Sequence, residues 1–289
     1  MSGQPSRIGF QGEVGAYSEE AAVGYFGPLV EPRPLPTFRA VCAAVESGAL
    51  AAGVIPTENS LAGSVGEALD ALSESALIVV GELLLPVRHR LLGRAGADLA
   101  GIRRVASHPQ ALAQCDAYLA SHGWQLIPAE DTAGAARALS ETADLTLAVI
   151  ASSRAAERYG LVILADDLAA ADNVTRFAIV VRPGSAAPPA DGPLAPPGDA
   201  PRSTLVIFET RHRPGALHAA LGAFADAGVN LTRIESRPTR RASWEYRFVV
   251  QLDGDAATEP ARSALAQLAD HAQAVRLLGS FPSADAARP

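Results

Sequence analysis

A cluster of polar residues stands directly before an apolar run in the segment 172–180, D-N-V-T-R-F-A-I-V. In an extended chain the side chains alternate between two faces, so Thr175 and Phe177 share one face and Arg176 points to the other. A hydroxyl beside an aromatic wall can donate a hydrogen bond to a departing oxygen or relay a proton. Threonine also suits strands simply because it is β-branched, so this segment alone leaves both interpretations open.

A second polar cluster, Asn59 and Ser60, follows the apolar run 52–55. The carboxyl end of a strand is the usual ligand position in open α/β sheets. The planar amide of Asn59 offers two donors and an acceptor, which can hold a carboxylate or a hydroxyl in a fixed orientation. As an alternative, Asn and Ser are common in turns without any ligand.

A third cluster begins at Ser107, where S-H-P-Q predicts a helix start with a Ser-x-x-Gln capping box and Pro in the first turn. Gln110 is then used by the cap, and Gln114, one turn further on, is the better candidate for reaching a ligand. His108 has a chemistry that allows proton donation, but a packing or solvent-facing role is the favoured interpretation.

Gly12 and Gly15 form a turn between the apolar run 7–10 and an alanine-rich helix. The unpaired N–H groups at such a helix start can bind a carboxylate or a phosphate. The spacing does not match a dinucleotide-binding fingerprint. A plain connecting turn explains the glycines equally well.

The elements that must position these residues alternate between strands and helices through the first 182 residues. They leave one unit, build a second and return at Asp172, which predicts two α/β lobes with a cleft between them. Residues 182–201 contain seven prolines and three glycines without periodicity, and this predicts a linker that does not pack. Beyond it the order β-α-β-β-α, with a possible last strand at 275–278, predicts a ferredoxin-like unit.

The composition is that of a globular protein with enough apolar material for two domains: 289 residues, 48% hydrophobic and 19% charged. The net charge of -7 argues against a nucleic-acid or anionic-membrane partner. Residues 1–7 lack the pattern of a secretory signal, and no apolar run reaches the ~18 residues of a membrane span, so we expect a cytoplasmic protein. Cys42 and Cys115 are expected to be buried free thiols, and the histidines show no metal-ligand spacing.

Five stretches, taken together and in this order, resemble the prephenate dehydratase family. They are G-F-Q-G-E-V-G-A-Y-S (9–18), G-V-I-P-T-E-N-S (53–60), S-H-P-Q-A-L-A-Q-C (107–115), T-R-F (175–177) and I-E-S-R-P (234–238). The resemblance extends from Arg7 to Phe281. It implies conversion of prephenate to phenylpyruvate, water and carbon dioxide without a metal or organic cofactor. It also implies an α/β fold in which the two-lobed catalytic domain resembles a type 2 periplasmic-binding-protein architecture.

The same resemblance assigns roles to individual residues. Thr175 matches the family's essential hydroxyl, which we assign to hydrogen bonding or proton relay at the departing oxygen. Catalytic roles in orientation and charge stabilisation fall on Asn59, Ser107 and Gln114. Substrate contacts fall on Ser60, Arg176 and Phe177, although the opposite direction of Arg176 leaves a structural role open.

The C-terminal unit resembles the ACT domain attached to enzymes of this family, where it forms an amino-acid effector site, usually for phenylalanine, at a subunit interface. The effector-binding residues that this resemblance implies are Gly215, Ala216, Leu217, Asn230, Leu231, Glu235 and Ser236. The helix start at Gly215 suits an effector carboxylate, and Glu235 suits its ammonium. We therefore expect L-phenylalanine as effector and a homodimer or homotetramer.

The expected boundaries are 7–182 for the catalytic domain, 183–202 for the linker and 203–281 for the ACT domain. Gln11, Gly12 and Glu13 stand where many relatives have a glycine-proline pair, and arogenate-using members share this variant, so prephenate and arogenate both remain candidate substrates. A non-aromatising prephenate decarboxylase is a further alternative. An amino-acid-binding sensor is an alternative of a different class, which the complete set of motifs disfavours.

Overall fold

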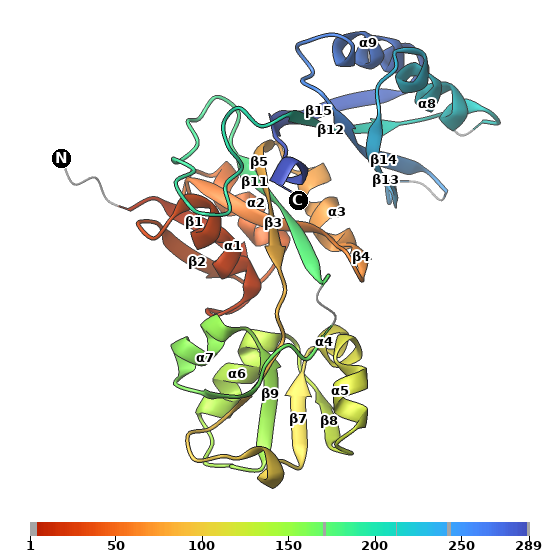
Figure 1. The fold of residues 1–289 in the computed structure, drawn as a ribbon. Coiled ribbons are helices and arrows are strands. Elements are labelled where there is room, and N and C mark those ends of the chain that lie inside the picture. Colours follow the sequence, from red (N-terminus) through yellow and green to blue (C-terminus); the bar gives the residue numbers. More distant parts are fainter. Residues whose placement is uncertain (1–4, 170–171, 212, 242–243, 288–289) are drawn as a thin grey trace.

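The computed structural model describes residues 5–169, 172–211, 213–241 and 244–287, and Figure 1 shows their arrangement. Two α/β lobes are joined by crossing segments, and a third unit with its own sheet lies against the first lobe. Both the two-lobed prediction and the ferredoxin-like prediction are confirmed. None of the helices in the described ranges is long and apolar enough to cross a membrane.

The first lobe is built on a sheet with the order β2-β1-β3-β11-β5, and the short strand β4 pairs with β3. The strands are β1 (Arg7–Gln11), β2 (Glu31–Leu35), β3 (Ala52–Asn59), β4 (Gly63–Ser64), β5 (Ile78–Pro86) and β11 (Val174–Val181), and the helices are α1 (Tyr17–Phe26), α2 (Phe38–Glu46) and α3 (Gly66–Glu74). Strand β11 runs antiparallel between β3 and β5, and each of its two faces packs into a buried core, with residues of α1 on one side and of α2 and α3 on the other. This is why its apolar run is continuous rather than alternating: Phe177 and Ile179 belong to one core, and Ala178 and Val180 to another.

The second lobe has a sheet with the order β10-β6-β9-β7-β8. The strands are β6 (Arg90–Gly93), β7 (Arg104–Ser107), β8 (Gln125–Pro128), β9 (Leu147–Ala151) and β10 (Val162–Ala165), and the helices are η1 (Leu99–Gly101), α4 (Pro109–Gln114), α5 (Asp116–Ala120), α6 (Thr132–Ser140) and α7 (Ser153–Tyr159). Side chains cap two of these helices: Asp131 accepts from Gly134 N at 2.7 Å at the start of α6, and Ser152 accepts from Ala155 N at 3.0 Å at the start of α7. The chain enters this lobe after β5 and returns to the first lobe at β11.

The C-terminal unit has the strand order β13-β14-β12-β15 with two helices on one face, the ferredoxin-like arrangement. Its strands are β12 (Arg202–Glu209), β13 (Leu231–Pro238), β14 (Tyr246–Asp253) and β15 (Ala274–Pro282), and its helices are α8 (Ala216–Asp226), α9 (Ala261–His271) and the terminal η2 (Ala284–Ala287). The possible last strand is therefore present, as β15. The helix-free face of the sheet is turned toward the first lobe.

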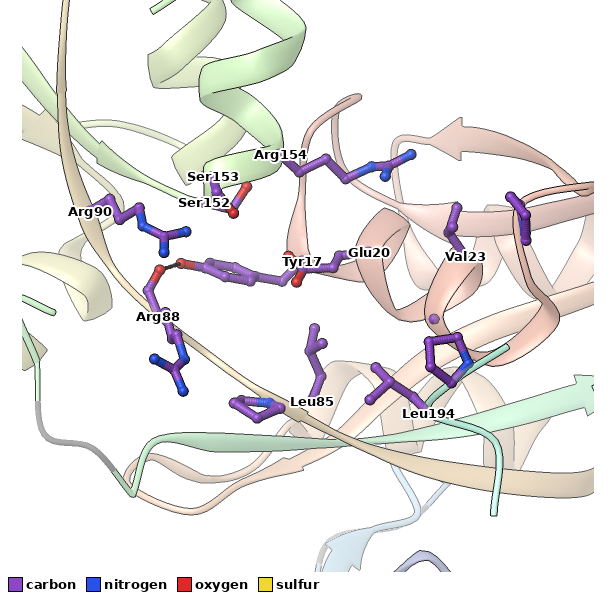
Figure 2. Close-up of a pocket in the computed structure, with 14 residues that line it drawn as sticks. Tyr17, Glu20, Val23, Leu85, Arg88, Arg90, Ser152, Ser153, Arg154 and Leu194 are labelled. Carbon is purple, nitrogen blue, oxygen red and sulfur yellow. Dashed lines mark hydrogen bonds between the residues drawn. The ribbon is translucent and has the colours of Figure 1, made fainter. Parts of the chain in front are cut away.

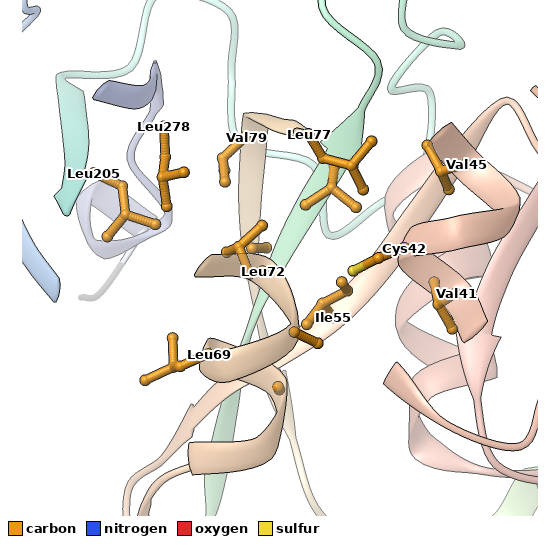
Figure 3. Packing of buried hydrophobic residues seen from close by; sticks show 14 of the residues in the cluster. Val41, Cys42, Val45, Ile55, Leu69, Leu72, Leu77, Val79, Leu205 and Leu278 are labelled. Atoms are coloured by element: carbon orange, nitrogen blue, oxygen red, sulfur yellow. The ribbon is translucent and has the colours of Figure 1, made fainter. Parts of the chain in front are cut away.

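That face shares a hydrophobic core with the first lobe (Figure 3). Leu205 and Leu278 from the C-terminal sheet belong to the same buried cluster as Leu69, Leu72 and Val79. Because the cluster loses its apolar contacts if the two units separate, burial holds them together. The C-terminal unit is thus docked on the first lobe rather than tethered beside it.

The prediction that residues 182–201 do not pack was wrong. Gly192 N donates to Tyr25 O at 2.9 Å, and Leu194 N donates to Gly24 O at 2.8 Å. Carbonyls in the last turn of a helix lack partners within the helix, and the linker satisfies these two at the end of α1. The side chain of Leu194 also packs against the core that contains Tyr25 and Phe26.

Candidate functional site

A cavity of about 380 Å³ lies between the two lobes, where strand β3 ends and β11 begins. Its lining includes Thr175 and Phe177 from β11, Asn59 from β3, and Gln114 from α4. The structure thus brings together four residues that the sequence analysis named from three separate segments. Thr175 and Asn59 are register partners in adjacent strands, which is why their side chains lie on the same face of the sheet.

Asn59 organises the floor of this cavity. Its Oδ1 accepts from the backbone N–H groups of Leu61 at 3.1 Å and Ala62 at 3.0 Å. Its Nδ2 donates to Thr175 Oγ1 at 3.0 Å and to Asn173 Oδ1 at 2.8 Å. With both amide atoms engaged and only 6% of the residue exposed, the orientation of Asn59 is tightly defined.

The network continues into the second lobe. Asn173 Nδ2 donates to Gln114 Oε1 at 3.0 Å, and Gln114 Nε2 lies 3.4 Å from Asn59 Oδ1. On its other side Gln114 Oε1 lies 2.8 Å from His89 Nε2, and His89 Nδ1 lies 3.1 Å from the hydroxyl of Tyr17. Burial lowers the pKa of His89, and the hydrogen bond with Gln114 partly offsets this effect. A chain of polar groups therefore links the two lobes across the cavity.

The charges of the lining are unusual for a site expected to hold an anion. Among the residues that the structure describes, the lining contains no arginine or lysine. Its titratable groups besides Tyr17 are two histidines, His89 and His108, and two acids, Glu130 and Asp131. Positive potential can come from His89 and from the N–H groups at the start of α1, where Tyr17 and Ser18 line the cavity and no side chain caps the helix.

The expected cap at Ser107 was wrong. Ser107 is the last residue of β7, fully buried, and its hydroxyl donates to Ile150 O at 2.7 Å. The cap of α4 is instead His108, whose Nδ1 accepts from Gln110 N at 3.2 Å. As a strand residue, Ser107 directs its side chain across the sheet instead of toward the helix start, and it does not line the cavity. Gln110, which the sequence analysis assigned to the cap, does line it.

Ser60 and Arg176 also lie outside the cavity lining. The hydroxyl of Ser60 donates to Asp172 O at 2.7 Å and accepts from Val174 N at 2.9 Å, which ties the end of β3 to the start of β11. Arg176 pairs with the buried Glu82 at 3.0 Å and with Asp285 at 2.9 Å. A third acid, Glu58, lies 3.5 Å from Arg176 Nε. Burial alone would lower the pKa of Arg176, but the charges and hydrogen bonds of Glu82 and Asp285 outweigh burial and raise it. The alternation along the strand, which turns Arg176 away from Thr175, accounts for this separation.

In the glycine turn before α1, the N–H of Gly15 is not free to bind an external anion. Gly15 N donates to the carboxylate Oε2 of Glu19 at 2.5 Å, so the chain's own side chain occupies the N–H group. Glu19 is in turn paired with Arg154 at 2.7 Å. The carboxylate bound at Gly15 N is therefore that of Glu19, a residue of the protein itself.

The residues expected to bind an effector are divided between two faces of the C-terminal sheet. Ala216 is buried at the start of α8, and Leu217 packs on the helix face. Glu235 pairs in register with Val249, which faces the first lobe, and its carboxylate accepts from Ser64 Oγ at 2.7 Å. Gly215 is the N-cap of α8 and has a positive φ of 80°. Asn230 Nδ2 donates to Asp253 at 2.9 Å. Leu231 and Ser236 belong to β13.

A second cavity of about 480 Å³ lies on the other side of the segment that carries His89 (Figure 2). It shares Tyr17 with the first cavity, and Figure 2 shows the hydroxyl of Tyr17 bonded to Arg88 O, at 2.8 Å. Its three arginines each pair with an acid: Arg88 with Asp167, Arg90 with Asp166, and Arg154 with Glu19.

Sequence reasoning missed three members of the polar network: Tyr17, His89 and Asn173. Tyr17 and Asn173 stood within quoted motifs without an assigned role, and His89 stood alone among six histidines. For Tyr17 and Asn173, their place inside a motif was the only signal in the sequence that they could belong to the site, and His89 had no such signal. Their convergence depends on the packing of α1, the crossing segment and β11, which no local pattern encodes.

Comparisons with known proteins agree on one family. The family model for prephenate dehydratase matches residues 8–185, and that for the ACT domain matches residues 204–270. A protein of Arabidopsis thaliana named arogenate dehydratase/prephenate dehydratase 1, chloroplastic, is 40% identical over 96% of this chain and 72% of its own length.

Solved structures also match nearly the whole chain. A prephenate dehydratase in complex with L-Phe, from Arthrobacter aurescens, has a TM-score of 0.86 and 33% identity over 98% of this chain and 91% of its own. A structure described as GqqA, a novel type of quorum quenching acylase, has a TM-score of 0.86 and 36% identity over 98% of this chain and 100% of its own.

Proposed function

Because the chain belongs to the prephenate dehydratase family, we propose that the cavity between its lobes converts prephenate to phenylpyruvate, water and carbon dioxide. The observation that carries this proposal is the pairing of the Thr175 hydroxyl with the Asn59 amide at the cavity wall. We assign the catalytic unit to residues 7–182, the linker to 183–202 and the regulatory unit to 203–281.

The reaction breaks a carbon–oxygen bond and a carbon–carbon bond of the same ring. The electron pair of the bond to the ring carboxylate moves into the ring as carbon dioxide leaves, the ring hydroxyl departs with its own bonding pair, and a proton converts it to water. Aromatisation drives the process, so the enzyme needs to orient the dianion, exclude water and assist the departing hydroxide.

The residues of the cavity suit these tasks. Thr175 accepts its bond from Asn59, so its own proton can point to the departing oxygen. Asn59 and Gln114 act as orienting groups, and Phe177 supplies the apolar wall beside the ring. Acyl transfer, the activity named for one of the structural relatives, requires a nucleophile activated by a neighbouring base. The amide of Asn59 is a donor toward Thr175 and does not activate its hydroxyl in this way.

For the three remaining candidates we propose supporting roles, given where they lie. Ser107 joins β7 to β9 through Ile150, and Ser60 joins β3 to β11. Arg176 anchors the reverse side of the strand that carries Thr175. Each of the three helps to hold an element that presents a cavity residue.

Arogenate is the second candidate substrate, because the Arabidopsis relative carries both activities in its name. The decisive experiment incubates the purified protein with prephenate and, separately, with arogenate, and identifies the products by mass. Phenylpyruvate from prephenate supports the proposal, whereas phenylalanine from arogenate alone would reassign the substrate. A product that keeps a non-aromatic ring, or no product from either, would contradict it.

We further propose that L-phenylalanine binds the C-terminal unit and regulates turnover. The support is the ACT-family match and the L-Phe complex of the Arthrobacter aurescens relative. The edge strand β13 is available for pairing with a second copy, so we infer a homodimer or homotetramer. We propose a cytoplasmic location, in keeping with the acidic composition of the chain.

A further inference from the structure

The orientation of the amides around His89 can be assigned from their neighbours. The backbone N–H groups of Leu61 and Ala62 can only donate, and both meet Asn59 Oδ1. The other atom of that amide, Nδ2, is therefore the donor toward Asn173 Oδ1 at 2.8 Å. The Asn59 amide has one orientation that satisfies all three bonds.

The same reasoning passes from Asn59 to Gln114. Because Asn173 Oδ1 accepts, the Nδ2 of Asn173 is the donor toward Gln114 Oε1, at 3.0 Å. Gln114 Oε1 is then an acceptor, and it faces His89 Nε2 at 2.8 Å. Two acceptors cannot form a hydrogen bond with each other, so His89 Nε2 carries a proton.

The other ring nitrogen of His89 faces Tyr17. The single hydroxyl proton of Tyr17 has two acceptors within reach, Arg88 O at 2.8 Å and His89 Nδ1 at 3.1 Å. If that proton goes to Arg88 O, then His89 Nδ1 must donate to the oxygen of Tyr17. A neutral ring that is protonated at Nε2 leaves one of the two contacts without a proton. Only the doubly protonated ring completes every bond of the chain.

The groups around His89 oppose one another in their effect on the second proton. Burial favours the neutral ring. The titratable groups that line the same cavity are Tyr17 on α1, His108 before α4, and Glu130 and Asp131 before α6. Arg88 and Arg90, the sequence neighbours of His89, line the second cavity instead and are paired with Asp167 and Asp166. An anion bound in the cavity adds its attraction for the second proton to that of the acids already in the lining, Glu130 and Asp131.

We propose that His89 is a positioning residue that takes up a second proton from solvent when an anionic substrate fills the cavity. As an imidazolium it holds Gln114 through Nε2–H and Tyr17 through Nδ1–H, and it supplies positive charge to a lining that has no arginine or lysine among its described residues. The proton stays on the ring and is not consumed by the reaction. The identity of the anion rests on the function proposed above, whereas the assignment of the tautomer does not.

The first test is nuclear magnetic resonance of the full chain with ¹⁵N-labelled histidine, which needs no turnover. In ligand-free protein at alkaline pH we expect His89 to be protonated at Nε2, and a ring protonated at Nδ1 would overturn the assigned chain. Saturation with phenylpyruvate, an anion that does not react further, should raise the pKa of the His89 ring by about one unit, a tenfold change in its acid constant. A titration that stays the same while other cavity signals shift would overturn the coupling to the anion.

The second test is the pH dependence of kcat/KM for prephenate. If the doubly protonated ring is the productive form, kcat/KM falls by about tenfold per pH unit above the pKa of His89. His89→Gln keeps a donor toward Gln114 but cannot be charged, so its rate should be lower and this fall should disappear. Tyr17→Phe removes the acceptor of Nδ1–H and should move the fall to lower pH.

His108→Gln is the matched control. His108 lines the same cavity but takes no part in the chain of hydrogen bonds from Asn59 to Tyr17. Its profile should keep the fall of the wild type, whatever its absolute rate. A fall that persists unchanged in His89→Gln, or that is absent from the wild type, would overturn the proposal. If the protein does not turn over prephenate at all, the function proposed above fails, and the tautomer measurement still decides the assignment of His89.

Discussion

Asn59 donates an N–H of its amide to the hydroxyl of Thr175, with 3.0 Å between Nδ2 and Oγ1, from the neighbouring strand. Because the Asn59 group can only donate at this atom, the oxygen of Thr175 accepts, and the hydroxyl proton is left to point elsewhere. Thr175 lines the cavity, so the cavity is where this proton can point. Thr175 is thereby prepared to donate to whatever the cavity holds.

Thr175→Val should lower prephenate turnover by roughly 10² to 10⁴-fold, the range typical of a lost proton-transfer group. Valine keeps the β-branched shape of a strand residue, so circular dichroism and thermal unfolding should stay close to the wild type. Thr175→Ser is the control, because it retains the hydroxyl and should retain most of the activity. Turnover by Thr175→Val that approached the level of Thr175→Ser would contradict the role of the hydroxyl.

Asn59→Asp should cost roughly 2 to 4 kcal/mol in transition-state stabilisation, measured as the loss in kcat/KM. The change keeps the size of the side chain but replaces the donor toward Thr175 and Asn173 by an acceptor. Asn230→Asp is the control, because Asn230 lies in the C-terminal unit, where its amide bonds only to Asp253 among the described side chains. Equal kcat/KM values for the two variants would show that the amide of Asn59 serves only the turn.

Asp70→Asn should destabilise the docking of the C-terminal unit by about 3 kcal/mol at neutral pH. Asp70 accepts two hydrogen bonds of 3.0 Å from Arg237 and one of 3.1 Å from Arg240, and its side chain is only 7% exposed. Burial alone would raise the pKa of Asp70, but the hydrogen bonds and charges of the arginines outweigh it and hold the pKa below its ordinary value.

A carboxyl whose pKa is lowered by folding stabilises the folded state above its unfolded pKa, and this contribution is lost as the pH falls through the folded value. Urea unfolding of the wild type and of Asp70→Asn should therefore differ most near neutral pH. The difference should shrink below about pH 4, where the unfolded carboxyl is protonated. A gap between the two proteins that persists undiminished in acid would argue against the ion pairs as its cause.

The two cysteines should be unreactive in the folded protein. Burial raises the pKa of Cys42 to about 11 and that of Cys115 to about 12. The reactive thiolate is therefore scarce at pH 8, and neither sulfur is accessible. A disulfide reagent such as Ellman's should label both thiols only as fast as the protein opens, and rapidly in denaturant. Fast labelling of the folded protein would show that the structure around Cys42 in α2, or around Cys115 between α4 and α5, opens readily.

Regulation by phenylalanine should depend on the contact between Glu235 and Ser64, which joins the C-terminal sheet to the strand beside Asn59. Glu235→Ala is expected to reduce inhibition while sparing turnover, and Ser64→Ala separates the two possible reasons. If Glu235 acts through the interdomain bond, both variants lose inhibition, but only Glu235→Ala loses affinity if Glu235 binds the effector itself. Calorimetry and rate measurements with phenylalanine distinguish these cases, and full inhibition of both variants would remove Glu235 from the coupling.

The sequence by itself determined most local features of this protein, with the cap of α4 as an exception. Caps at Thr37, Asp131 and Ser152, and the alternation that separates Thr175 from Arg176, depend on residues within a few positions of one another. The order of strands and helices, together with five short motifs, was sufficient to predict the two lobes, the ferredoxin-like unit and the family. These signals are readable because hydrophobic period and capping chemistry act over one or two turns of chain.

Only the tertiary structure decided which polar groups meet. His89, Tyr17 and Asn173 come from separate segments. Asn173 bonds to Asn59 and Gln114, Gln114 to His89, and His89 to Tyr17, because α1, α4 and the start of β11 converge between the lobes. The burial of Ser107 and the packing of Leu194 on α1 are likewise long-range results, in which backbone groups find partners far along the chain. A hydrogen bond forms only within a narrow range of distance and angle, so these contacts depend on the final packing. They follow no periodic pattern in the sequence from which they could be predicted.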